Sequence, residues 1–248
     1  MQVYLWCYGR HEAMIFVKKN HRDALALALM LSLTHWAQPT CAQTASAHPH
    51  VEAALQTLDA TDLDEDWYFT MEVIDGDELQ QIESDPTRPP YERRELLTVN
   101  GEAPDADRLA QFADAEKKRI DDQRDAPGGY AHMVDIATLE PLEAPADDEI
   151  YAFVPQVQKL EKAREHLRGK LFMDAQSGWI RQLEIYNTET LSPAFSVSVD
   201  TYRLKLDFGE VQGENLLQSL QSHAIGKAGF LKSFDSKVHV RFSDFRRR

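Results

Sequence analysis

Cysteine is almost absent from this sequence, because its 248 residues include only Cys7 and Cys41. Two cysteines are too few for a cysteine-rich zinc module or for a disulfide-dense scaffold. They also lie too far apart for a Cys-x-x-Cys redox site. We therefore expect the fold to be stabilised by an apolar core.

Basic residues are scarce, with 27 Lys plus Arg against 41 Asp plus Glu and a net charge of −14. Nucleic-acid binding depends on clustered Lys and Arg, and so does adhesion to an anionic membrane surface by bulk charge. The balance therefore disfavours both. The chain is 43% hydrophobic, which indicates a globular protein rather than a disordered one.

Catalytic motifs are missing: there is no G-x-S-x-G, no H-E-x-x-H and no glycine-rich phosphate loop. The histidines beyond residue 50 have no second His or Cys at ligand spacing. The acidic run Asp62–Asp66 begins like a calcium loop, but Trp67 and Val73 stand where that loop needs glycine and glutamate. We interpret the run as a solvated turn, and we interpret His48-Pro49-His50 as a spacer. The sequence thus predicts no enzyme, no cofactor and no metal site.

Long hydrophobic runs are also missing. The apolar run Ala24–Leu33 has ten residues, whereas a transmembrane helix needs about 20. Lys18, Lys19 and Arg22 precede the run and small residues follow it, which is typical of a cleavable secretory signal. Cleavage is expected after Ala42 or after Ala47, and the alternative interpretation is an N-terminal core helix.

The predicted organisation is a signal peptide over residues 1–47, in which Met14 is a possible start, followed by one domain over residues 48–248. The mature chain would lose four basic and two acidic residues together with both cysteines, and would carry −16. We expect it to be periplasmic and without a transmembrane segment.

Strands are predicted from period-2 alternation, from hairpin and turn signals, and from short apolar runs. Trp67–Val73 alternates, and Asp75-Gly76 is a hairpin signal that would return the chain. The clearest alternation lies in Tyr202–Phe208. The other predicted strands are Leu79–Ser84, Glu95–Val99, Ile150–Val154, Lys170–Asp174, Trp179–Tyr186, Leu217–Leu231 and Lys237–Phe245.

Helices are predicted at His50–Leu58 and after Pro104, where Asp105 can cap a helix that ends near Arg124. The apolar side of the second helix should carry Leu109, Phe112, Ala113 and Ile120. Gln156–Leu167 is ambiguous, and Pro141–Asp148 is interpreted as a loop. Arg246–Arg248 is interpreted as an unstructured tail, and the alternative is a contact for an acidic partner. About eight strands with two helices describe an α+β fold.

One sheet face should be apolar and rich in aromatic residues. For any single residue on it, burial in an ordinary core is the first interpretation. The alternative is an apolar cavity for an acyl chain, left because few helices cover a strongly curved sheet. The residues of this face are Trp67, Phe69, Met71, Trp179, Leu183, Tyr202, Leu204, Leu206 and Phe208.

The order of elements, with the block Gly169–Ile180 (GKLFMDAQSGWI), resembles the periplasmic LolA/LolB-like lipoprotein-carrier superfamily and its G-x-L-x-x-D-x-x-[TS]-G-x-I hairpin. Asp85–Pro89, Leu96–Gly101 and Phe242–Arg246 resemble segments of uncharacterised exported proteobacterial proteins. The resemblance spans roughly residues 50–245, and no family ligand residue can be matched position by position.

The resemblance implies an incomplete β-barrel: a strongly curved antiparallel sheet with helices covering its concave face. It also implies non-catalytic binding or carriage of a hydrophobic ligand, a lipid or a lipoprotein acyl chain. The alternative that it implies is an envelope sensor of the sigma-factor-regulator type, which would use the same fold to hold a protein partner.

Overall fold

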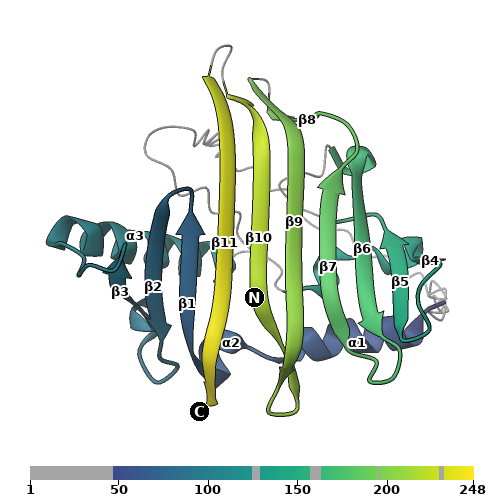
Figure 1. Cartoon of the computed structure of the whole chain (residues 1–248), viewed down its shortest axis with the longest axis horizontal. Helices are drawn as coiled ribbons and strands as arrows, with labels where there is room; N and C mark the ends of the chain where they lie inside the picture. Colours follow the sequence, from purple (N-terminus) through teal and green to yellow (C-terminus); the bar gives the residue numbers. More distant parts are fainter. Residues whose placement is uncertain (1–46, 125–128, 157–162, 195, 229–231) are drawn as a thin grey trace, which may run out of the picture. The chain divides into compact units, whose positions relative to one another are not determined.

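A computed structural model of the chain describes residues 47–124, 129–156, 163–194, 196–228 and 232–248. These residues form an α+β fold built on one curved, unclosed antiparallel sheet of eleven strands (Figure 1). The strand order is β3-β2-β1-β11-β10-β9-β7-β6-β5-β4, and β8 pairs with β9. β3 and β4 are the two edges, so the sheet does not close on itself.

The strands follow the alternating segments of the sequence. Their bounds are β1 Trp67–Asp75, β2 Glu78–Ser84, β3 Arg94–Val99, β4 Glu140–Leu142, β5 Asp148–Phe153, β6 Leu167–Asp174, β7 Ile180–Asn187, β8 Leu191–Ala194, β9 Val197–Val211, β10 Glu214–Ala228 and β11 Lys232–Arg247. The α+β class and the positions of the nine longer strands are confirmed, except that the predicted end of the strand Leu217–Leu231 lies outside the described residues. The expected number of about eight was too low, because β4 and β8 are short and each contains a proline.

Both predicted helices are present, as α1 Pro49–Ala60 and α3 Ala106–Arg124, and a short α2 spans Leu63–Asp66. Asp105 accepts a hydrogen bond from the backbone amide of Arg108 at 2.7 Å, which is the expected cap. Three 3₁₀ turns complete the elements: η1 Pro90–Glu92, η2 Ala131–Met133 and η3 Ile136–Thr138. None of the described helices has the length and apolarity that a membrane span would require.

Tight turns join the first strands where the sequence supplies residues that tolerate positive φ. Gly76 (φ 58°) follows Asp75 in the β1–β2 turn, and Asn100 (φ 54°) with Gly101 (φ 82°) ends β3. The Asn100 side chain also accepts a hydrogen bond from the amide of Leu79 at 2.8 Å, which ties the end of β3 to β2. These turns fix the register in which β1, β2 and β3 pair.

One face of the sheet, here called the inner face, carries the core. Residues that pair across neighbouring strands point to the same face, so a row of pairs traces it. One such row crosses seven strands and is apolar except for the Tyr151 hydroxyl: Val73, Val240, Leu220, Leu206, Leu183, Leu171 and Tyr151.

Helices and turns cover the inner face from its two ends. α1 buries Val51, Leu55 and Leu58. Near its start His50 contacts Tyr151 of β5, and after its end Thr61 contacts Glu214 of β10. The segment 129–139 packs beside it, with the Tyr130 ring 5.0 Å from Phe208 of β9. α3 contacts β3 and η1 at the other end. Helices therefore cover this face, as expected.

The C-terminal arginines correct a prediction, because they are not an unstructured tail. β11 continues to Arg247 and pairs Arg246 with Tyr68 and Arg247 with Trp67. The Arg246 and Arg247 guanidinium groups lie 5.3 and 5.8 Å from the centres of those two rings. An irregularity at Asp244 (φ 54°) interrupts the period-2 alternation of β11. The sequence pattern therefore did not indicate that the strand continues to Arg247.

Candidate functional site

Eight of the nine predicted face residues lie in the apolar core. Trp67, Phe69, Met71, Leu183, Tyr202, Leu204, Leu206 and Phe208 are 0–7% exposed. These eight therefore lie in the core on the inner face of the sheet, and their role in ligand binding stays a prediction. Because they have almost no free surface, they would contact a ligand only if the elements above them moved.

Trp179 is the exception and corrects the predicted face. It lies before β7, which begins at Ile180, and it is partly exposed, whereas Ile180 is 1% exposed. The register of β6 and β7 shifts there, from Phe172 opposite Gln182 to Met173 opposite Ile180. The extra residue breaks the period-2 alternation, so counting back from Leu183 selects the wrong residue.

A partly exposed part of the inner face lies on β1, β10 and β11. We call it the apolar strip and define it by Val73, Leu220, Val240 and Phe242, all partly buried and packed against the core. Val240 pairs with both Val73 and Leu220, and Phe242 pairs with Met71. The strip thus continues the buried row of β7 and β9 outward to partly exposed surface.

The apolar strip lies between the two groups of elements that cover the inner face. The 129–139 segment reaches β9 through Tyr130 and β5 through η3, while α3 contacts β3. The middle of β1 and β11 lies between these contacts in the strand order. Sequence reasoning missed the strip, since Val73 and Val240 alternate like any other core residues and local pattern does not reveal which part of a face is covered.

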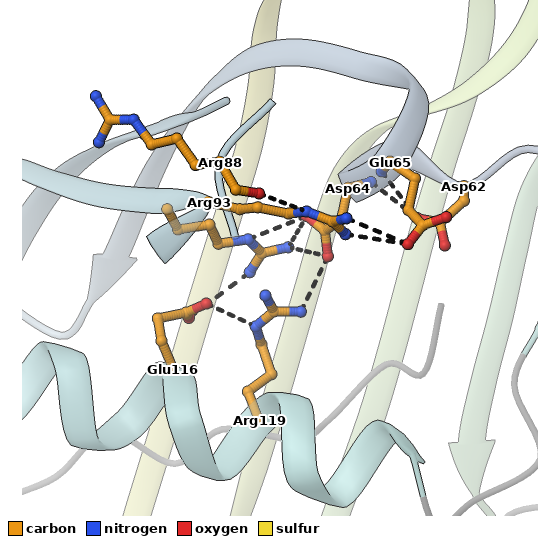
Figure 2. A network of polar contacts seen from close by, with 8 residues as sticks. Asp62, Asp64, Glu65, Arg88, Arg93, Glu116 and Arg119 are labelled. Atoms are coloured by element: carbon orange, nitrogen blue, oxygen red, sulfur yellow. Dashed lines mark hydrogen bonds and ion pairs between the residues drawn. The ribbon is translucent and has the colours of Figure 1, made fainter. Parts of the chain in front are cut away.

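A buried group of charges fixes α3 to the rest of the fold (Figure 2). Asp64 of α2 accepts hydrogen bonds from Arg94 of β3 at 2.8 Å and from Arg119 of α3 at 3.0 Å. Glu116 of α3 lies 2.9 Å from the Nε of Arg119 and 3.9 Å from Arg94. Two carboxylates and two guanidinium groups make the cluster neutral, which is how charges are tolerated in a core.

Asp64 corrects the prediction of a solvated turn at residues 62–66. Asp62 caps α2 by accepting from the amides of Asp64 and Glu65, but the Asp64 side chain is buried. Burial alone would raise the pKa of Asp64, yet Arg94 and Arg119 outweigh it and lower that pKa to about 2. A carboxylate held by two arginines does not offer a calcium site.

The buried side of α3 also differs from the predicted one. Phe112 is buried, but Leu109 is 44% exposed and Ala113 is exposed. Glu116 and Arg119 occupy the buried positions four and seven residues after Phe112. These charged side chains are tolerated there because Arg94 lies close to Glu116 and Asp64 forms an ion pair with Arg119. An apolar-pattern search cannot find buried charges of this kind.

A second polar group ties the start of α1 to β5. His50 Nε2 lies 3.0 Å from both Glu149 Oε2 and the Tyr151 hydroxyl, and the hydroxyl donates to Glu149 at 2.8 Å. Burial and the bond to Glu149 raise the pKa of Tyr151 to about 12, so the phenol stays protonated. Within the described part of the chain, no group of three or more His, Cys, Asp or Glu is arranged to hold a metal ion.

No protein-family model matches the chain, and no curated protein matches it. Among solved structures, a LolA superfamily protein from Nitrosomonas europaea is similar at 13% sequence identity with a TM-score of 0.31, over 82% of this chain and 94% of that one. A similarity at this level carries no conclusion about function.

Proposed function

We propose that this protein binds an acyl chain of a lipid or lipoprotein on the apolar strip, without catalysis, in the periplasm. The observation that supports the proposal is the half-covered state of Val73, Leu220, Val240 and Phe242, in direct continuity with a fully buried apolar row. Removing apolar surface from water is favourable by about 25 cal/mol per Å², or about 0.8 kcal/mol per buried CH₂ group. An acyl chain can therefore gain affinity simply by covering the strip.

The test is binding of an uncharged fluorescent C16 alcohol to the purified protein and to two variants. Val240→Asn removes apolar contact from the strip, and we expect the affinity to fall about tenfold, equivalent to roughly 1.4 kcal/mol. Leu97→Asn is the matched control, since Leu97 is 39% exposed on β3 and lies outside the strip. Its affinity should equal that of the wild type. Failure of the wild type to bind the probe, or equal losses in both variants, would refute the proposal.

A second experiment distinguishes acyl-chain carriage from the sensor function that the family resemblance implies. A carrier purified from its native envelope should contain lipid in a reproducible stoichiometric amount, detectable by mass spectrometry. A lipid-free protein that repeatedly captures one inner-membrane protein would instead favour the sensor.

A further inference from the structure

The apolar strip ends at a carboxylate. Val73 and Asp75 alternate to the same face of β1, and Asp75 pairs with Val238 of β11, two residues from Val240 of the strip. Across the hairpin, Asp75 pairs with Glu78 of β2. Any chain lying along the strip toward the β1–β2 turn therefore arrives at Asp75.

The Asp75 carboxylate is incompletely satisfied. Asp75 is only partly buried, but its Oδ2 atom is buried and has no hydrogen-bond partner among the described residues. Burial and the neighbouring charge of Glu78 raise the pKa of Asp75, and Arg108 only partly opposes them. A buried carboxylate oxygen without a donor is costly, so a donor that arrives with a ligand would stabilise it.

The charges around Asp75 do not balance. Arg108, from the first turn of α3, forms its ion pair with Glu78, and the Gln80 amide also donates to Glu78 at 2.7 Å. Lys237 lies on the opposite face of β11 from Val238, where it pairs with His223 of β10. Its ammonium group lies 3.5 Å from Asp235. Two carboxylates and one guanidinium therefore meet at this end of the strip, which leaves one negative charge.

We infer that the amphiphile bound on the strip carries a cationic head group, in the simplest case a primary ammonium, and that Asp75 binds this group. The inference rests on the proposed function. An ammonium supplies both the missing donor and the missing positive charge, and such charge-assisted hydrogen bonds are about twice as strong as neutral ones. An anionic head group would instead meet Asp75 and Glu78 with like charge.

The experiment compares two C12 amphiphiles with the same chain, dodecylammonium and dodecanoate, below their micelle concentrations. Each competes with the uncharged fluorescent C16 alcohol at pH 7. We expect the wild type to bind dodecylammonium at least about tenfold more tightly than dodecanoate. Asp75→Asn should bring the two affinities within about twofold, because the amide keeps the shape and removes the charge.

A matched control separates Asp75 from the general attraction of an acidic protein for cations. Glu83→Gln changes the net charge equally, but Glu83 is exposed and lies on the opposite face of β2. This variant should keep the preference for dodecylammonium. Thermal unfolding checks that each variant is folded, and Asp75→Ser serves as a second variant if Asp75→Asn is not.

The outcomes separate the two proposals. If neither amphiphile displaces the probe and the probe itself does not bind, the proposed acyl-chain function fails. If both amphiphiles bind but with equal affinity, or if the preference survives Asp75→Asn, the assignment of Asp75 is overturned while acyl-chain binding stands. If Glu83→Gln loses the preference as well, bulk charge explains it and the assignment is again overturned.

Discussion

At the scale of single residues, Asp64 shows how a carboxylate can occupy a protein core. Two guanidinium groups face it, from Arg94 and Arg119, and Glu116 completes a neutral set. Desolvating four charges is expensive, so such a set is weak evidence for a large net stabilisation. Removing one member is costly all the same, because the others remain buried without their partner.

We expect Asp64→Asn to lower the free energy of unfolding by about 3–5 kcal/mol, because Arg94 and Arg119 would stay buried facing a neutral amide. Asp66→Asn is the control, since Asp66 lies on the same short helix but is exposed. It should change stability by less than about 0.5 kcal/mol. Urea unfolding at pH 7 measures both, and equal effects of the two variants would contradict the assigned role of Asp64.

The same variant should alter the dependence of stability on pH. Asp64 has a pKa of about 2 in the folded protein and 3.8 as the ordinary value, so its contribution is complete above about pH 4. As the pH falls from 4 toward 2, the unfolded chain takes up the proton first and the wild type should lose about 2 kcal/mol from this group. Asp64→Asn should lack this part of the acid-induced loss.

At the scale of elements, β5 and β6 are joined by a close fit between a glycine and an aromatic ring. Gly169 pairs with Phe153, and a Cβ built on Gly169 would come within 2.2–2.5 Å of the Phe153 ring. The ring thus occupies the space that any other residue at position 169 would need. The predicted hairpin pattern placed a glycine here, but only the pairing of β5 with β6 explains why.

Gly169→Ala should therefore destabilise the fold by about 1–3 kcal/mol, as overpacking does in cores. In a Phe153→Ala background the same substitution should cost much less, because the ring that causes the clash is gone. Gly209→Ala is the matched control in β9, where the added Cβ would meet only the flexible Gln218 side chain at 3.2 Å. Equal destabilisation by Gly169→Ala in the presence and absence of the Phe153 ring would show that the clash is not the cause.

At the scale of the whole molecule, the described elements begin at α1, directly after the segment predicted to be a signal peptide. Residues 1–46 lie outside the described part of the chain, so the leader and its cleavage stay predictions. They bear on the proposed function, because a periplasmic acyl-chain carrier must be exported and released from its leader.

Mass spectrometry of the periplasmic fraction of cells expressing the whole gene should find a new N-terminus near Gln43 or His48. The A-x-A rule favours His48, since Ala45, Ser46 and Ala47 precede it. A chain that retains Met1 or Met14 would contradict the export prediction, and with it the periplasmic part of the proposed function.

The sequence by itself determined the features that depend on neighbours along the chain. Period-2 alternation located β1, β9 and β11, turn signals located β2, β6 and β7, and a short apolar run located β5. Asp75-Gly76 and Asn100-Gly101 located turns, and helical spacing located α1 and α3. These signals are local, because strand and helix periods and positive-φ turns are properties of a few consecutive residues.

Only the tertiary structure decided which of those features meet. Asp64 and Arg119 are 55 residues apart, so no local sequence pattern predicts that they form an ion pair in the core. The same holds for the apolar strip and for Asp75 at its end, since strand order and the placement of the covers decide which alternating residues keep free surface. Burial is a property of the assembled sheet and helices, and the sequence pattern specifies only which residues can tolerate it.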